Sequence, residues 1–140
     1  MKIVSYNDNY KEQIIDLWKN VFGYKDKRNN PEIVINKKIA TDDNLFFIAL
    51  LDNIVIGTIM AGYDGHRGWI YLLAVEPKHR SKNIGTKLLN KAEKCLKDKG
   101  CVKINLQILY SNESVKSFYF KNGYKIEERI SMGKEISENI

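Results

Sequence analysis

The sequence predicts a mixed α/β fold, and three observations support this prediction. Apolar residues fill segments 45–51 and 54–60 on both sides of Asp52-Asn53, which is typical of an antiparallel β-hairpin. Segment 84–99 repeats its apolar residues at helical spacing, and segment 102–109 alternates apolar with polar residues as a strand does. The 140 residues have the length of one ordinary domain. We therefore expect residues 1–140 to form a single domain around a mixed sheet.

The elements before the hairpin follow local start and stop signals. Residues 2–6 alternate weakly, which predicts a short strand, and the next segment has helical spacing up to Phe22. Gly23 ends this helix, and the polar residues 24–30 predict a loop. Asn30-Pro31-Glu32 combines a capping residue, a first-turn proline and a first-turn carboxylate. This pattern predicts a second helix up to about residue 39.

The elements after the hairpin alternate between strand and helix patterns. We expect strands at residues 69–75 and 102–109, helices at 84–99 and 111–120, and a final strand pair at 124–136. Pro77 ends the first of these strands, and Gly100 ends the long helix. The predicted order is β-α-α-β-β-β-α-β-α-β-β. It describes a largely antiparallel front half, followed by one strand–helix–strand crossover.

The composition limits the kinds of partner. The 23 Lys and Arg against 17 Asp and Glu give a net charge of +6, which attracts anions without choosing among them. The lysine-rich face of helix 84–99 has no interleaved aromatic residues for base stacking, so we expect no nucleic-acid partner. No apolar run approaches the roughly 18 residues of a membrane span, and the N-terminus lacks the pattern of a signal peptide. We expect a cytoplasmic protein without a membrane partner.

The two cysteines do not indicate a metal site or a disulfide framework. Cys95 and Cys101 are six positions apart, without a CxxC pair or a nearby histidine pair. We expect no metal, and we expect Cys95 to be a reduced thiol on the apolar face of its helix.

The junction before the long helix has the properties of an anion site. A helix N-terminus offers free backbone N–H groups and the positive end of the helix dipole. Gly85 permits close approach of an anion, Asn83 tolerates a left-handed backbone, and Arg80 and Lys82 add positive charge. Thr86 adds a hydroxyl. From these residues alone, a phosphate site and an ordinary solvated connection are equally favoured.

Two motifs carry a resemblance to a known family. Arg80-x-x-Asn83-x-Gly85 resembles the pyrophosphate motif (Gln/Arg)-x-x-Gly-x-(Gly/Ala) of the GNAT superfamily of acetyl-CoA-dependent N-acetyltransferases, with Asn83 in place of the first glycine. Residues 112–124 are similar to the family's Asn-x-x-(Ala/Ser)-x-x-(Phe/Leu)-Tyr-x-x-x-Gly-(Phe/Tyr). Residues 73–77 also look like the family's strand that leads into the loop, and the element order matches over nearly the whole chain.

The resemblance implies a GNAT fold whose central strands splay apart after the strand at 69–75. It implies that pantetheine bonds to backbone near Leu73 and Val75 and that Asn112 helps to hold it. The diphosphate of acetyl-CoA would lie on the loop formed by Arg80, Ser81, Lys82, Asn83, Ile84, Gly85 and Thr86. The implied activity is direct transfer of an acetyl group from acetyl-CoA to a primary amine, of a small molecule or a protein, in a ternary complex.

The resemblance also implies that the phenol of Tyr119 protonates the departing thiolate; packing as a core aromatic is the alternative role. The general base stays open among Asp64, His66, Glu76 and water, and the first two also suit a polar turn. Acceptor specificity is expected from loops 24–30 and 63–68.

Two other functions stay open. One is a non-catalytic acyl-CoA-binding or sensing module on the same fold, and a more distant one is a basic nucleic-acid-binding protein. A monomer and a homodimer both remain compatible with the sequence.

Overall fold

The computed structural model describes residues 1–23 and 27–137. The chain forms two compact units, Met1–Leu106 and Gln107–Ile140. The first unit contains these main elements: β1 (Lys2–Ser5), α1 (Lys11–Phe22), α2 (Pro31–Ala40), β2 (Phe46–Leu51), β3 (Ile54–Tyr63), β4 (Gly68–Val75), α3 (Ile84–Asp98) and β5 (Ile104–Asn105). The second unit contains α4 (Glu113–Lys121). None of the helices in the described ranges is long and apolar enough to cross a membrane.

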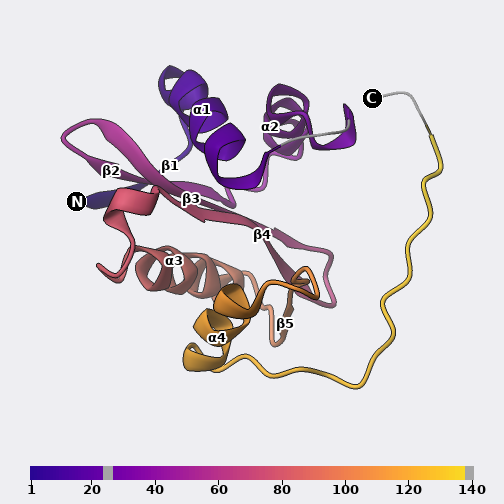
Figure 1. Cartoon of the computed structure of the whole chain (residues 1–140). Coiled ribbons are helices and arrows are strands. Elements are labelled where there is room, and N and C mark those ends of the chain that lie inside the picture. The colour runs from indigo at the N-terminus through magenta and orange to yellow at the C-terminus, as the bar shows by residue number, and fades with distance from the viewer. Residues whose placement is uncertain (24–26, 138–140) are drawn as a thin grey trace. The chain divides into compact units, whose positions relative to one another are not determined.

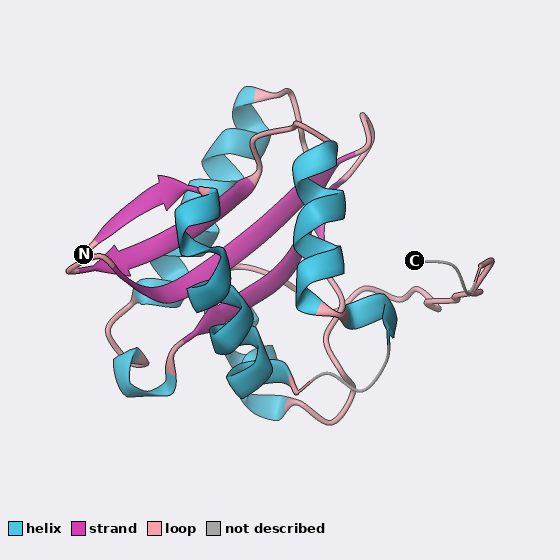
Figure 2. Ribbon diagram, turned by 90° about the horizontal axis from the view of Figure 1, so that it is seen from above, coloured by secondary structure: helices cyan, strands magenta, loops and turns pink. Residues whose placement is uncertain are grey.

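The first unit is a three-layer structure around one sheet. The strands follow the order β1-β2-β3-β4-β5; the first three pairings are antiparallel, and β4 pairs with β5 in parallel. Helices α1 and α2 cover one face of the sheet, and α3 covers the other (Figures 1 and 2). The mixed α/β sheet with an antiparallel front half is therefore confirmed.

The core lies on both faces of the sheet. Ile14 and Trp18 of α1 are fully buried, and they pack with residues of β2, β3 and β4. On the opposite face, α3 buries the apolar stripe predicted from its spacing, including Leu88 and Leu96. A Cβ at Gly57 would lie 2.9 Å from Leu88 Cδ1 and 3.0 Å from the Ala74 carbonyl oxygen. The missing side chain thus lets α3 approach β3 closely.

Strand β4 contains a bulge. Tyr71 lies opposite Met60 and Ala74 lies opposite Thr58, so β4 has one more residue than β3 between these two pairs. Leu72, inside the bulge, has a φ of 49°. A leucine rarely adopts this left-handed conformation, so neighbouring contacts must hold it.

The predicted strand 102–109 is too long. Pairing with β4 joins only Gly68 to Ile104 and Trp69 to Asn105. Val102 has an exposed fraction of 92%, so the apolar alternation here does not reflect a buried strand face. A strand needs a partner for its backbone groups, and in the described residues β4 and β5 pair nowhere beyond these two positions.

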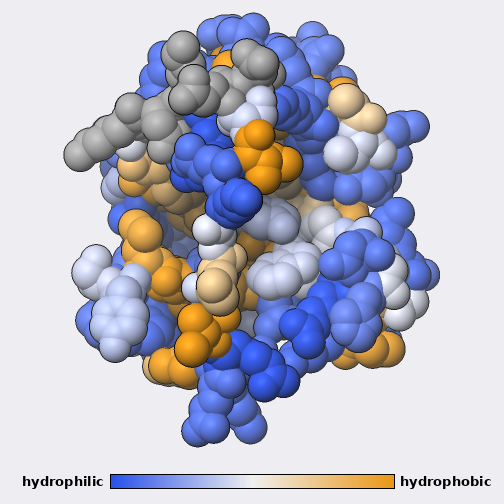
Figure 3. Space-filling model, turned by 90° about the vertical axis from the view of Figure 1, so that its right-hand side faces the viewer, coloured by the Kyte–Doolittle hydropathy of each residue, from blue (hydrophilic) through white to orange (hydrophobic). Residues whose placement is uncertain are grey.

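The predicted final strand pair at 124–136 is wrong. The described part of this segment forms no strand. Its apolar side chains Ile126, Ile130, Met132 and Ile136 have exposed fractions between 73% and 91%. Figure 3 shows a face of the molecule where hydrophobic side chains, in orange, lie among mostly hydrophilic ones. The apolar spacing predicted strands, but a strand also requires a partner edge, and β5 is only two residues long.

The second unit is organised around α4, at the position predicted from the sequence. The Asn112 side-chain oxygen accepts a hydrogen bond from the Val115 N–H at 3.3 Å and so caps the helix start. Asn122 and Gly123 follow its end, and Gly123 has a φ of 89°, which a glycine adopts without strain.

Candidate active site

The start of α3 is left open by its own residues. Asn83 has a left-handed backbone, with φ 61° and ψ 17°, and its side chain makes no capping hydrogen bond in the described structure. The Lys87 N–H donates to the Asn83 carbonyl at 3.0 Å. The N–H groups of residues 84–86 precede this bond, so they point outward along the helix axis. This arrangement matches the sequence prediction that Asn83 tolerates the left-handed conformation, and it suits an anion.

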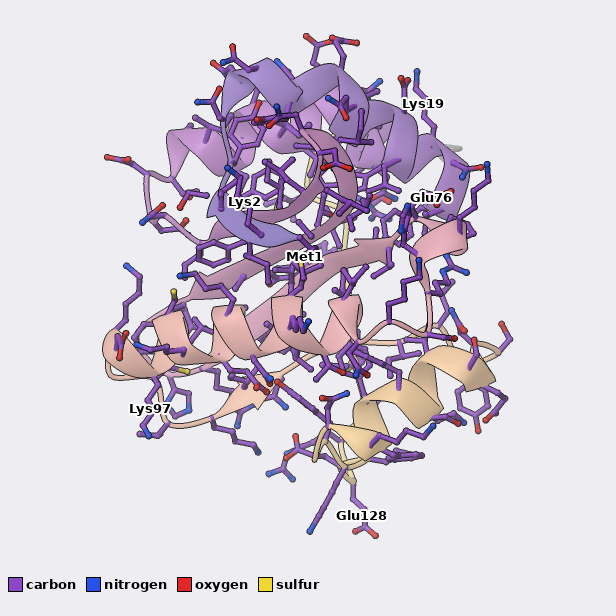
Figure 4. The ribbon with its side chains drawn as sticks, turned by 90° about the vertical axis from the view of Figure 1, so that its left-hand side faces the viewer. Met1, Lys2, Lys19, Glu76, Lys97 and Glu128 are labelled. Carbon is purple, nitrogen blue, oxygen red and sulfur yellow. The ribbon has the colours of Figure 1, made fainter. Side chains whose placement is uncertain are left out.

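The loop before α3 brings positive charge to the same place. The Glu76 carboxylate accepts from the Lys78 N–H at 2.9 Å and so fixes the turn that leaves β4. The Arg80 Nε donates to the Val75 carbonyl at 3.1 Å, which holds the guanidinium beside the end of β4. The side chain of Lys82 is exposed. In Figure 4, Glu76 lies where β4 turns toward α3, and Lys97 lies at the far end of that helix.

The edge of β4 that faces away from β3 is open beyond its first two residues. The Glu76 N–H donates to the Ile56 carbonyl at 2.8 Å, so Ala74 and Glu76 direct their backbone groups toward β3. Backbone direction alternates along a strand, so Leu73 and Val75 direct theirs to the opposite edge. Within the described residues β5 does not pair with this part of β4. Leu73 therefore offers its backbone groups to an extended ligand, and Val75 offers its N–H, while the Val75 carbonyl already accepts from Arg80.

The second unit holds the other two predicted site residues. Asn112 uses its side-chain oxygen for the cap of α4, and Ser114 Oγ also donates to it at 3.3 Å. Tyr119 is buried, with edge-to-face ring contacts to Phe118 and Tyr124. Burial raises the pKa of the Tyr119 phenol to about 12. The hydroxyl therefore stays protonated at neutral pH, as a general acid must before it acts.

Two of the candidate bases have structural roles. The Asp64 Oδ1 accepts from the N–H groups of Arg67 and His66, each at 2.7 Å, and these bonds hold the pKa of Asp64 below its usual value. A carboxylate with a lowered pKa is a weaker base. Glu76 caps the turn after β4. Of the two loops expected to select the acceptor, 63–68 forms the β3–β4 turn, and residues 24–26 of the other lie outside the described residues.

Sequence reasoning missed two residues near this site. Tyr71 has an exposed fraction of 49% and lies opposite Met60, just before the bulge. Burial of part of its ring, followed by the charge of Asp64, raises the pKa of Tyr71. Thr58 is buried in β3, and its hydroxyl contacts both α1 and β4. A lone threonine within an apolar strand was the available signal for Thr58, because a buried hydroxyl needs partners.

Comparisons with known proteins agree with this geometry. The chain has 27% identity to the PaiA N-acetyltransferase of Thermoplasma acidophilum, solved in complex with coenzyme A, with a TM-score of 0.78 over 92% of each chain. It has 27% identity to an acetyltransferase of the GNAT family from Staphylococcus aureus, with a TM-score of 0.74 over 87% of this chain and 81% of the other. The aminoglycoside antibiotic 6'-N-acetyltransferase AAC(6')-IG of Acinetobacter haemolyticus shares the fold at 17% identity, with a TM-score of 0.79 over 98% of this chain and 100% of that one. The sequence also matches the Acetyltransferase (GNAT) family over residues 11–124. The chain therefore belongs to the GNAT family of acetyltransferases.

Proposed function

We propose that this protein is an acetyl-CoA-dependent N-acetyltransferase that transfers an acetyl group directly to a primary amine. The observation that carries the proposal is the open N-terminus of α3 beside the unpaired edge of β4, both within the first unit. The family membership supports acetyl transfer, and the neighbour at 27% identity that was solved with coenzyme A supports the choice of co-substrate.

Two kinds of backbone contact would hold acetyl-CoA. The N–H groups of residues 84–86 bind the diphosphate, with Arg80 and Lys82 supplying opposite charge. The pantetheine arm follows the open edge of β4 and bonds to the backbone of Leu73 and Val75. Ser81, which has a φ of 68°, and Asn83 turn the loop so that the helix start faces the ligand.

The family resemblance assigns the proton to Tyr119 and a further contact with pantetheine to Asn112. The neutral amine attacks the thioester carbon, a new C–N bond forms and the C–S bond breaks. The Tyr119 hydroxyl gives its proton to the departing sulfur and regains one from solvent, while the base takes the proton that the amine loses. The amide of Asn112 contacts pantetheine. We propose that residues 1–140 act as one functional domain, in the cytoplasm.

A second function is favoured by one specific observation. Asp64 and Glu76 use their carboxylates to hold turns, which leaves them less suited to accept a proton from the amine. A non-catalytic acyl-CoA-binding or sensing module would need the cofactor site and no base. Turnover separates these two functions, whereas both require acetyl-CoA binding.

Acetyl-CoA binding and turnover are tested in that order. A ligand that binds only the folded state raises its stability, by roughly 2.7 kcal/mol at a concentration about 100 times Kd. We expect acetyl-CoA to raise Tm, and we expect a panel of small amines and peptides to include an acceptor that releases coenzyme A. No change in Tm at millimolar acetyl-CoA, with the protein folded, would contradict both functions. Binding without turnover on any amine would favour the non-catalytic module.

A further inference from the structure

Thr58 links three elements of the first unit through one buried hydroxyl. Its side chain has an exposed fraction of 0%. Trp18 Nε1 of α1 donates to Thr58 Oγ1 at 2.8 Å, and Thr58 Oγ1 donates to the Leu72 carbonyl of β4 at 3.0 Å. The hydroxyl thus accepts one hydrogen bond and donates another, so all three polar groups are satisfied in the core.

The bond to Leu72 falls at the bulge of β4. Two residues, Leu72 and Leu73, lie opposite Ile59 alone, so the Leu72 carbonyl is displaced from the regular ladder with β3. The Thr58 hydroxyl supplies a donor to this displaced carbonyl. Leu72 is held at a φ of 49°, which a leucine does not adopt without such support.

The bulge decides which backbone groups face the open edge of β4. Side-chain and backbone directions alternate strictly along a strand, so an extra residue exchanges the two edges for all residues that follow it. With the bulge at Leu72, the groups of Leu73 and Val75 face the open edge, and those of Ala74 face β3. A bulge that moved along β4 would exchange these roles.

From this geometry we infer that Thr58 is a positioning residue for acyl-CoA: with Trp18, it holds the Leu72 bulge and so directs the Leu73 and Val75 backbone toward the pantetheine arm. This inference rests on the proposed function. A purely structural role would differ in one respect. Loss of the hydroxyl would then lower stability without changing the affinity of the folded protein for acetyl-CoA.

Thr58→Val tests the inference, because valine keeps the shape of threonine and removes the hydroxyl. Calorimetric titration at a temperature where the protein is folded should show acetyl-CoA binding weakened by about tenfold. Thr58→Ser keeps the hydroxyl and should restore Kd to within about twofold of the wild type. In the free protein, amide hydrogen exchange at Ala74, whose backbone faces β3, should be faster in Thr58→Val than in Thr58→Ser.

Two further variants complete the test. Ile35 of α2 is fully buried in the same core and is neither of the two hydrogen-bond partners of Thr58, so Ile35→Val should lower Tm and leave Kd and the exchange at Ala74 unchanged. Trp18→Phe removes the donor to the hydroxyl together with part of a fully buried ring, so it should also lower Tm, and it should weaken acetyl-CoA binding in the same direction as Thr58→Val but less. If Thr58→Val does not fold, Trp18→Phe carries the test.

The outcomes separate this inference from the proposed function. Wild-type protein that fails to bind acetyl-CoA would overturn the proposed function and the inference with it. Wild-type binding with an unchanged Kd in Trp18→Phe and in every Thr58→Val sample that folds would overturn the inference alone.

Discussion

Helices α2 and α3 both begin after an asparagine, but the two asparagines do opposite things. Asn30 has a φ of −59°, and its side-chain oxygen accepts from the N–H groups of Glu32 at 3.1 Å and Ile33 at 3.3 Å. Asn83 has a φ of 61°, and in the described structure its side chain caps nothing. The start of α2 is therefore closed by its own residues, whereas the start of α3 is open.

The charges around the two helix starts differ in the same way. The carboxylate of Glu32 lies in the first turn of α2, and Lys11 Nζ is 3.6 Å from it. The first turn of α3 has no acidic residue. A cap contributes about 1 kcal/mol, and α3 is stabilised instead by its buried apolar stripe. The comparison shows that a helix that packs well can leave its N-terminus to a ligand.

The first prediction sharpens the comparison with a third helix. Helix α4 also has a closed start, capped by Asn112. We therefore expect α4 to contribute the Tyr119 side chain to the reaction, and not its N-terminus. Tyr119→Phe keeps the ring and removes the hydroxyl, and kcat should fall by about 10²-fold or more, while the Kd of acetyl-CoA changes much less. Steady-state kinetics with an accepted amine and direct titration measure the two effects.

The raised pKa of Tyr119, about 12, fixes the pH dependence. The phenol stays protonated until the pH approaches that value, so its proton should not limit kcat in the neutral range. An unchanged kcat in Tyr119→Phe, with chemistry shown to be rate-limiting, would leave Tyr119 as a core aromatic.

The second prediction compares equivalent positions in the two first turns. Gly85 and Glu32 are each the second residue of their helix. Gly85→Val should crowd a bound phosphate and weaken acetyl-CoA binding by roughly tenfold or more, without an intrinsic cost to the helix, because valine has a higher helix propensity than glycine. The matched control, Glu32→Val, should leave Kd unchanged. Equal affinity in a folded Gly85→Val protein would mean that the loop is only a connection.

The third prediction concerns replacement of each of the two asparagines. Asn30→Ala removes a side-chain cap and should lower the free energy of unfolding by about 1 kcal/mol, with no change in acetyl-CoA affinity. Asn83→Gly removes no cap and relieves a left-handed backbone, so it should be neutral or slightly stabilising and should retain binding. Chemical denaturation and titration provide both quantities. A loss of stability in Asn83→Gly as large as in Asn30→Ala would show that the two helix starts are equivalent.

The smallest effect is expected at the turn between β3 and β4. Asp64 resembles Asn30 in its use, because one side-chain oxygen accepts two backbone N–H groups. Asp64→Asn retains such an oxygen, and kcat should change by less than about threefold. A fall of kcat by 10²-fold or more, which is the scale of general base catalysis, would assign Asp64 as the base.

The sequence predicted those features that depend on local patterns. The hairpin at 45–60 and the helix at 84–99 are confirmed, because apolar spacing and turn residues act within one segment. The left-handed backbone at Asn83 is also local, since asparagine tolerates a positive φ.

Features that depend on pairing between segments could not be predicted. The bulge at Leu72 arises from the register of β4 against β3, and leucine gives no local sign of a positive φ. The apolar alternation at 102–109 and 124–136 describes side-chain spacing but not the presence of a partner edge, so it predicted more strand than the chain forms.

The central claim is that the open N-terminus of α3 binds the diphosphate of acetyl-CoA. The most direct test is the amide spectrum of ¹⁵N-labelled protein, recorded without and with saturating acetyl-CoA. We expect large changes in chemical shift at the N–H groups of Ile84, Gly85 and Thr86, and almost none at those of Glu32 and Ile33, which the Asn30 cap already engages. Saturated binding with the amides of residues 84–86 unmoved would contradict the account.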